Sequence, residues 1–310
     1  MEIYVKKVVL LVIILLSFTV ALFFMQDTEE KSGSNIKIVV STFALYDIAK
    51  AVGGEEATVN MVIPFGVEVH SFEPTPKTII EIKKSTLFLF SGAALEPWVQ
   101  KLPTSDNMRD MSRYVDLRKV SQHVEGHNAT KHTHGAIDPH YWLDVGNMKL
   151  LTQKIALELV KLDPEHESLY VQRAAAYIDE LSEIDSRYKK QLKTCKLHEV
   201  ILHHNTLGYV AARYGFEVEA LTGLSPDALA DAKTMAGLAN SIKEQGIEVL
   251  FFEAFVSDRL MKNLAKENNI RLDYLEPLAN ITAIQAQAGM RYEDGMYANL
   301  EKLSKAMQCR

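Results

Sequence analysis

One uninterrupted helical run in the middle of the chain constrains the fold more than any other feature. From Glu165 to about Lys193, apolar residues recur at helical spacing with charges between them and without a glycine or proline. The run predicts a single helix of about thirty residues, which is long for a globular domain. The chain has 310 residues, more than one hydrophobic core usually serves, so a lobe is expected on each side of this helix.

Short strand-like and helix-like segments alternate on both sides of the run. Before it, strands are expected at 36–43, 58–63, 86–91 and 113–117, and helices at 45–52, 77–84, 96–101 and 147–162. After it, strands are expected at 199–203, 217–221, 247–252 and 272–275, and helices at 207–214, 231–245, 257–268 and 292–307. This alternation predicts an α/β fold of two lobes, each with a parallel sheet flanked by helices.

The predicted boundaries follow from these segments. An N-terminal α/β lobe is expected at 35–162, a long and rigid linking helix at 163–194, and a C-terminal α/β lobe at 195–310. Because a single rigid helix joins the lobes, we expect them to move less on binding than lobes hinged by flexible strands.

The first 34 residues are predicted to lie outside the fold. Lys6 and Lys7 precede an uncharged apolar run from Val8 to Met25, and a polar linker follows it. This pattern is typical of a signal peptide or a short membrane anchor, and no A-x-A-like cleavage site or lipidation cysteine follows the run. The protein is therefore expected outside the cytoplasm, in a periplasm or on the outer face of the membrane, attached to the membrane if the segment stays uncleaved.

Cysteine content and charge set further limits. Cys195 and Cys309 are the only cysteines, and in an exported protein they can form one disulfide or remain two unpaired thiols. The net charge is −6, and no cluster of lysine and arginine suggests contact with phosphate groups. Nucleic acid is therefore not an expected partner.

Three histidines and one acid lie where a metal site can form. His70 and His140 lie in proline-bounded turns, His204 ends a strand-like run, and Glu276 ends the last strand just before Pro277. Imidazole and carboxylate are the ligands of a divalent transition metal in a site of about four ligands. Because ligands of open α/β sheets bind beyond the carboxyl ends of strands, the site is expected in the cleft between the lobes.

Two neighbouring residues are weaker candidates for the metal site. His203 should point to the opposite strand face from His204, so it is the poorer candidate. Glu253 ends another strand and is a candidate for orienting a ligand through its free N–H. A lone histidine is more often a surface residue, so the joint placement of His70, His140 and His204 carries the prediction.

A histidine-rich loop is predicted at 121–137. Four of the ten histidines lie there without apolar periodicity: His123, His127, His132 and His134. The composition favours an auxiliary metal-attracting loop, and the alternative is a solvated loop with incidental histidines.

Several segments together resemble a known family, the metal-binding solute receptors of ABC importers that capture zinc or manganese outside the cytoplasmic membrane. The matching segments are 70–76, 91–98, 138–142, 204–209 and 213–215. The resemblance implies that His70, His140 and His204 bind the metal and that an acid before a proline, here Glu276, is the fourth ligand. Family members usually have aspartate there, and zinc-binding members often carry a histidine-rich insert where loop 121–137 lies.

The function expected is an extracytoplasmic receptor that binds zinc as cargo and delivers it to an ABC permease and its ATPase. It is expected to be a monomer without enzymatic activity. Three imidazoles and one carboxylate suit Zn²⁺, whereas Mn²⁺ usually takes more oxygen ligands. Manganese or iron is the alternative cargo. The rival classes are a zinc hydrolase, although the chain contains no H-E-x-x-H, and an adhesin that needs metal for its fold.

Overall fold

Two sheets and a pair of long helices organise the chain. The computed structural model describes residues 36–120, 136–228, 232–254 and 259–310, and Ile36–Arg310 form one compact unit. The predicted N-terminal segment and most of the predicted histidine-rich loop lie outside the described residues. Among the residues that are described, no helix combines the length and apolar character needed to cross a membrane.

The first sheet is parallel and has the order β2-β1-β3-β4. Its strands are β1 (Ile36–Val40), β2 (Ala57–Met61), β3 (Leu87–Phe90) and β4 (Met108–Asp110). Helices α2 (Phe43–Gly53) and α3 (Pro76–Lys84) follow β1 and β2. The inner strand β1 is buried at Ile38 and Val40 on one face and at Val39 on the other, as expected for a strand covered on both faces.

The second sheet is also parallel and has the order β10-β9-β7-β8. Its strands are β7 (Glu199–His204), β8 (Glu217–Thr222), β9 (Val249–Glu253) and β10 (Arg271–Leu275), and its helices are α6 (Gly208–Tyr214), α7 (Ala232–Gln245) and α8 (Arg259–Asn268). Helix α6 ends at Gly215, whose φ of 81° is a left-handed value that favours glycine. The predicted fold of two parallel sheets flanked by helices is confirmed.

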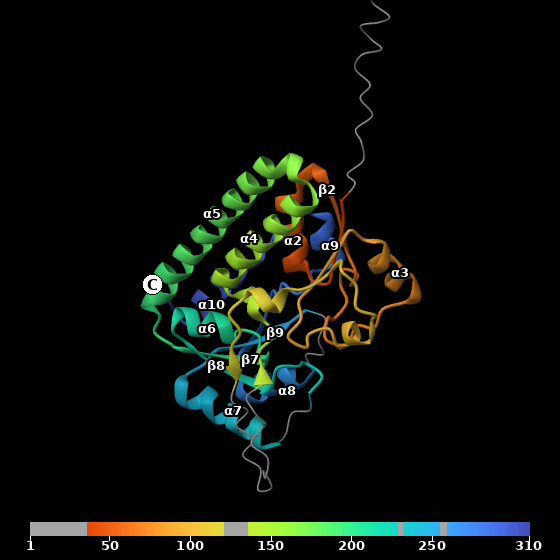
Figure 1. Cartoon of the computed structure of the whole chain (residues 1–310). Helices are drawn as coiled ribbons and strands as arrows, with labels where there is room; N and C mark the ends of the chain where they lie inside the picture. The colour runs from red at the N-terminus through yellow and green to blue at the C-terminus, as the bar shows by residue number, and fades with distance from the viewer. Residues whose placement is uncertain (1–35, 121–135, 229–231, 255–258) are drawn as a thin grey trace, which may run out of the picture. The chain divides into compact units, whose positions relative to one another are not determined.

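The long linking helix is present and is supported along its length. Helix α5 spans Glu167–Gln191, between 3₁₀ turns at Pro164–His166 and Leu192–Thr194. It lies beside α4 (Val145–Leu162), as Figure 1 shows, and also contacts α2 and α10 (Tyr292–Ala306). Contacts with three helices restrain α5. The link between the sheets is therefore a helix bundle and not a single isolated helix.

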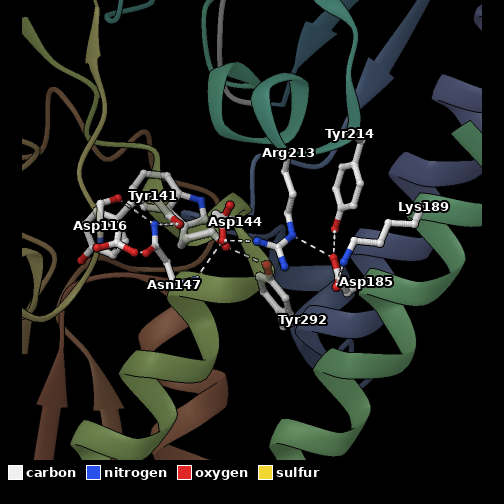
Figure 2. A network of polar contacts seen from close by, with 10 residues as sticks. Asp116, Tyr141, Asp144, Asn147, Asp185, Lys189, Arg213, Tyr214 and Tyr292 are labelled. Atoms are coloured by element: carbon white, nitrogen blue, oxygen red, sulfur yellow. Dashed lines mark hydrogen bonds and ion pairs between the residues drawn. The ribbon is translucent and has the colours of Figure 1, made fainter. Parts of the chain in front are cut away.

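A polar network fastens the second lobe to this bundle (Figure 2). Arg213 of α6 donates to Asp185 of α5 at 2.8 Å, and its Nη1 lies 3.4 Å from Asp144, the residue that caps α4. Tyr214 and Lys189 also donate to Asp185. Although burial opposes it, the hydrogen bonds from Arg213 and Lys189 lower the pKa of Asp185 to about 2. The carboxylate therefore stays charged at neutral pH and holds α6 against α5.

The C-terminal segment returns from the second sheet to the first lobe. Ala279 and Ile281 accept backbone hydrogen bonds from Phe43 at 2.7 Å and Gly66 at 2.9 Å. A short helix, α9 (Ala283–Gln287), and α10 follow, and α10 contacts α2 and α5. Residues after β10 therefore help to hold the two lobes together.

The chain end is covalently tied. Cys195 and Cys309 form a disulfide that joins the end of the linking helix to the C-terminus. Of the two alternatives that the sequence left open for these cysteines, the structure has the disulfide.

Two short elements differ from expectation. The strand predicted at 113–117 is replaced by β4, just before a 3₁₀ turn at Met111–Tyr114, because Asp110 accepts a hydrogen bond from the Ser112 N–H and starts a turn there. The helix predicted at 96–101 is a 3₁₀ turn at Pro97–Lys101, and Pro103 disfavours helical geometry at the residue before it. A two-stranded antiparallel pair, β5 (Lys119–Val120) and β6 (Ala136–Ile137), was not anticipated.

Candidate metal centre

Three histidines from distant segments converge on one point. Ligand nitrogens of His70, His140 and His204 all lie within 4.8 Å of one another, and Nε2 of His70 is 3.4 Å from Nε2 of His140. Their ring centroids are 5.4 to 5.8 Å apart. Three imidazole nitrogens this close together have the spacing that a single transition-metal ion requires of its ligands.

His140 is held by a carboxylate two residues before it. Asp138 is fully buried, and its Oδ1 accepts hydrogen bonds from the backbone N–H of His140 at 3.0 Å and from Nδ1 at 2.8 Å. A proton on Nδ1 leaves the lone pair of Nε2 free for a metal, and this carboxylate–histidine pairing is common among metal ligands. Sequence reasoning did not assign this role to Asp138, although its position in the turn before His140 was a usable signal.

His204 is placed by a strand end and by a second carboxylate. It is the last residue of β7, and its Nδ1 lies 3.2 Å from Oε1 of Glu253 at the end of the adjacent strand β9. Thr206 donates to the same carboxylate oxygen at 2.8 Å. Neither ring nitrogen of His204 has a hydrogen-bond partner of good geometry among the described residues, although the ring is buried. A buried nitrogen without a partner is costly, and a bound metal would satisfy it.

His70 comes from the loop that follows β2, before α3. A small pocket contains all three histidines and is also lined by Glu68, Glu253 and Trp142. The indole Nε1 of Trp142 donates to the Pro277 carbonyl at 2.9 Å, which joins the two sides of the pocket. Glu68 was not anticipated from the sequence. Among the described residues it is one of two carboxylates that line the pocket, and it accepts hydrogen bonds from Ser71.

Burial favours the neutral, metal-binding form of the imidazoles. Burial, with a smaller effect of His140, lowers the pKa of His70 to about 3. Burial also lowers the pKa of His204 well below its ordinary value, and the neighbouring imidazoles act in the same direction. For Glu253, burial raises the pKa to about 8, against the hydrogen bond from Thr206. A dication would supply a positive charge beside these buried imidazoles and carboxylates.

The structure does not bring Glu276 into the histidine group. Glu276 follows β10 as expected, but its carboxylate accepts a hydrogen bond from Gln285 at 2.8 Å and is not among the residues that line the pocket. Burial raises its pKa, against the effects of Gln285 and Lys302. The assignment of Glu276 as a metal ligand stays a prediction.

Of the other candidates, the structure describes only His203. His203 is buried, and its ring centroid lies 6.2 Å from that of His204, but it is not part of the converging group. The loop histidines His123, His127, His132 and His134 lie outside the described residues.

Two α/β lobes with a group of three convergent histidines between them are the arrangement of a solute-binding protein of the metal-receptor class. The chain belongs to the family described as zinc-uptake complex component A, periplasmic, which matches residues 38–306.

Named relatives agree with this membership. The chain is 29% identical to the high-affinity zinc uptake system protein ZnuA of Bacillus subtilis, over 91% of each chain. It is 30% identical to the zinc-binding protein AdcA of Streptococcus pyogenes over 96% of its own length, and it spans only 61% of that longer relative.

Solved structures share the fold. The laminin-binding protein Lmb of Streptococcus agalactiae, described as bifunctional with adhesin and metal-transporting activity, matches with a TM-score of 0.78 and 25% identity, over 88% of this chain and all of that one. Zn(II)-bound AdcA of Streptococcus pneumoniae matches with a TM-score of 0.73 and 29% identity, over 88% of this chain and 57% of that one.

Proposed function

We propose that this chain is an extracytoplasmic receptor that binds one zinc ion as cargo and passes it to an ABC permease and its ATPase. The observation that carries the proposal is the convergence of His70, His140 and His204 within 4.8 Å. Membership of the zinc-uptake family and similarity to relatives named for zinc uptake support it. The protein acts as a monomer, and segment 1–34 directs it out of the cytoplasm or anchors it to the membrane.

Zinc suits the donor set better than manganese. Three neutral imidazoles give a compact nitrogen site of the kind that Zn²⁺ accepts with four ligands, whereas Mn²⁺ favours oxygen ligands and higher coordination. Manganese or iron remains the alternative cargo. The histidines of loop 121–137 would add weaker zinc sites to this one.

Zinc should bind the ectodomain, residues 35–310, once per chain and far more tightly than manganese. We expect one high-affinity event in a calorimetric titration with zinc, and a manganese affinity at least a hundredfold lower, about 2.7 kcal/mol. Equal affinity for the two ions would contradict zinc as the cargo. Because zinc outranks manganese at most nitrogen and oxygen sites, the metal content of protein purified from its host completes the test.

Two rival functions lead to different results. A zinc hydrolase needs an exchangeable water on the metal and a nearby acid or base, and zinc-loaded protein would then cleave ester or peptide substrates. An adhesin that needs the metal for folding would unfold on chelation. We expect zinc-loaded protein to cleave neither substrate. We also expect the protein to stay folded on chelation, because a receptor releases its metal as a folded protein.

Two carboxylates compete for the role of the fourth contact to the metal site. Glu276 is the sequence-based candidate, and Glu253 lines the pocket beside His204. We expect Glu253→Gln to weaken zinc binding about tenfold, because the amide cannot hold His204 as a carboxylate does. Glu276→Gln is the comparison variant, and a change of about twofold at most would place its carboxylate with Gln285 and outside the metal site. The reverse order of the two losses in a zinc titration would identify Glu276 as the metal ligand.

A further inference from the structure

The segment after His204 contacts the backbone of Asp138, the residue whose carboxylate holds His140. Tyr209, in the first turn of α6, donates its hydroxyl to the backbone carbonyl of Asp138 at 2.8 Å. The same hydroxyl accepts a hydrogen bond from the backbone N–H of Arg118 at 2.9 Å. Arg118 is in turn bound to this turn, since its carbonyl accepts the N–H of Asp138 at 3.0 Å. The hydroxyl of Tyr209 therefore joins α6 to two backbone segments, at Arg118 and at Asp138, and Asp138 in turn holds His140.

Gly208 makes the approach between these segments possible. A Cβ atom at this position would lie 2.5 Å from Nη1 of Arg118 and 2.8 Å from Oδ2 of Asp138, closer than side-chain contacts allow. The guanidinium of Arg118 also lies over the ring of Tyr209, 5.5 Å from its centroid. The absence of a side chain at Gly208 therefore lets the N-terminal turn of α6 touch the Arg118–Asp138 pair.

This contact connects ligands from the two lobes. His204 lies at the start of the segment 204–209 and Tyr209 at its end, while Asp138 holds His140 through two hydrogen bonds. A shift of the second lobe would move His204 and would also disturb the turn that fixes His140. The two ligands are thus set relative to each other before a metal arrives.

We propose that Gly208 and Tyr209 are positioning residues of the metal site, which align His140 of the first lobe with His204 of the second through the Asp138 turn. The proposal rests on the proposed function, because it concerns the same three histidines. A site aligned in advance loses less conformational freedom on binding, so it holds zinc more tightly and adapts less well to an ion that needs other geometry.

The test removes one hydroxyl and compares it with a matched hydroxyl elsewhere. Tyr209→Phe should weaken zinc binding about tenfold, in the range typical for groups that orient metal ligands. Tyr188→Phe is the control, because its buried hydroxyl also donates to a backbone carbonyl, that of Met296, at 2.6 Å. Both variants should lose similar thermal stability, while the control keeps the wild-type zinc affinity.

A second pair of variants tests the close approach. Gly208→Ala should weaken zinc binding and reduce the ratio of zinc to manganese affinity, because the Asp138 turn must shift. Gly237→Ala, in α7, is the control, since nothing lies within 4 Å of the added Cβ there.

The outcomes separate this inference from the proposed function. Wild-type protein that fails to bind zinc would overturn the proposed function. Wild-type protein that binds zinc, with Tyr209→Phe and Gly208→Ala both matching their controls in zinc affinity and in the zinc-to-manganese ratio, would overturn the positioning role alone.

Discussion

Replacing His140 with alanine is expected to weaken zinc binding at least a hundredfold, or about 2.7 kcal/mol. The substitution removes one of three converging imidazoles. His70 and His204 already belong to the group, so neither can replace the lost ligand. Calorimetric titration of the ectodomain with zinc measures the loss directly.

His166→Ala is the control for this experiment. His166 also pairs with a carboxylate, Asp163, at 2.6 Å, but it lies in the turn between α4 and α5. It should bind zinc as the wild type does. A His140→Ala variant with an unchanged isotherm would show that the tight site lies elsewhere in the chain.

The second large effect is expected on stability. Exchanging both Cys195 and Cys309 for serine should lower the free energy of unfolding by about 5 kcal/mol, because the disulfide closes a long loop in the unfolded chain. The sequence separation of the two cysteines is 114 residues. The bond also fixes the end of α10 against the end of α5, so its loss frees the C-terminus to fray.

Denaturant unfolding of the oxidised wild type and the double serine variant measures this effect. Zinc affinity should be unchanged, because neither cysteine lines the pocket that contains the three histidines. An unfolding midpoint equal to that of the wild type, or free thiols detected in the purified native protein, would contradict a stabilising disulfide.

The sequence predicts those parts of the fold that depend on local pattern. The alternation of short apolar runs and helices gave both parallel sheets, and the uninterrupted run from Glu165 gave α5 to within a few residues. The three histidines could be predicted for a similar reason. Each follows or ends a strand or lies in a proline-bounded turn, and parallel strands place such positions at one edge of a sheet.

Other features depend on contacts between distant residues and leave little local signal. The return of residues 277–292 to the first lobe rests on backbone hydrogen bonds such as Phe43 N–H to Ala279. The side chain of Glu276 turns to Gln285, a partner that strand periodicity does not specify. The link from Tyr209 to Asp138 likewise joins residues 71 positions apart. Such contacts decide which of several well-placed side chains reaches the metal site.

The most direct test of the metal site is a crystal structure of the zinc-loaded ectodomain with anomalous diffraction at the zinc edge. We expect one strong peak among His70, His140 and His204, with zinc–nitrogen distances of about 2.0 to 2.1 Å to all three. The same map identifies the fourth ligand as Glu276, Glu253 or water. A peak elsewhere, or zinc in contact with none of these histidines, would contradict the receptor site described for this chain.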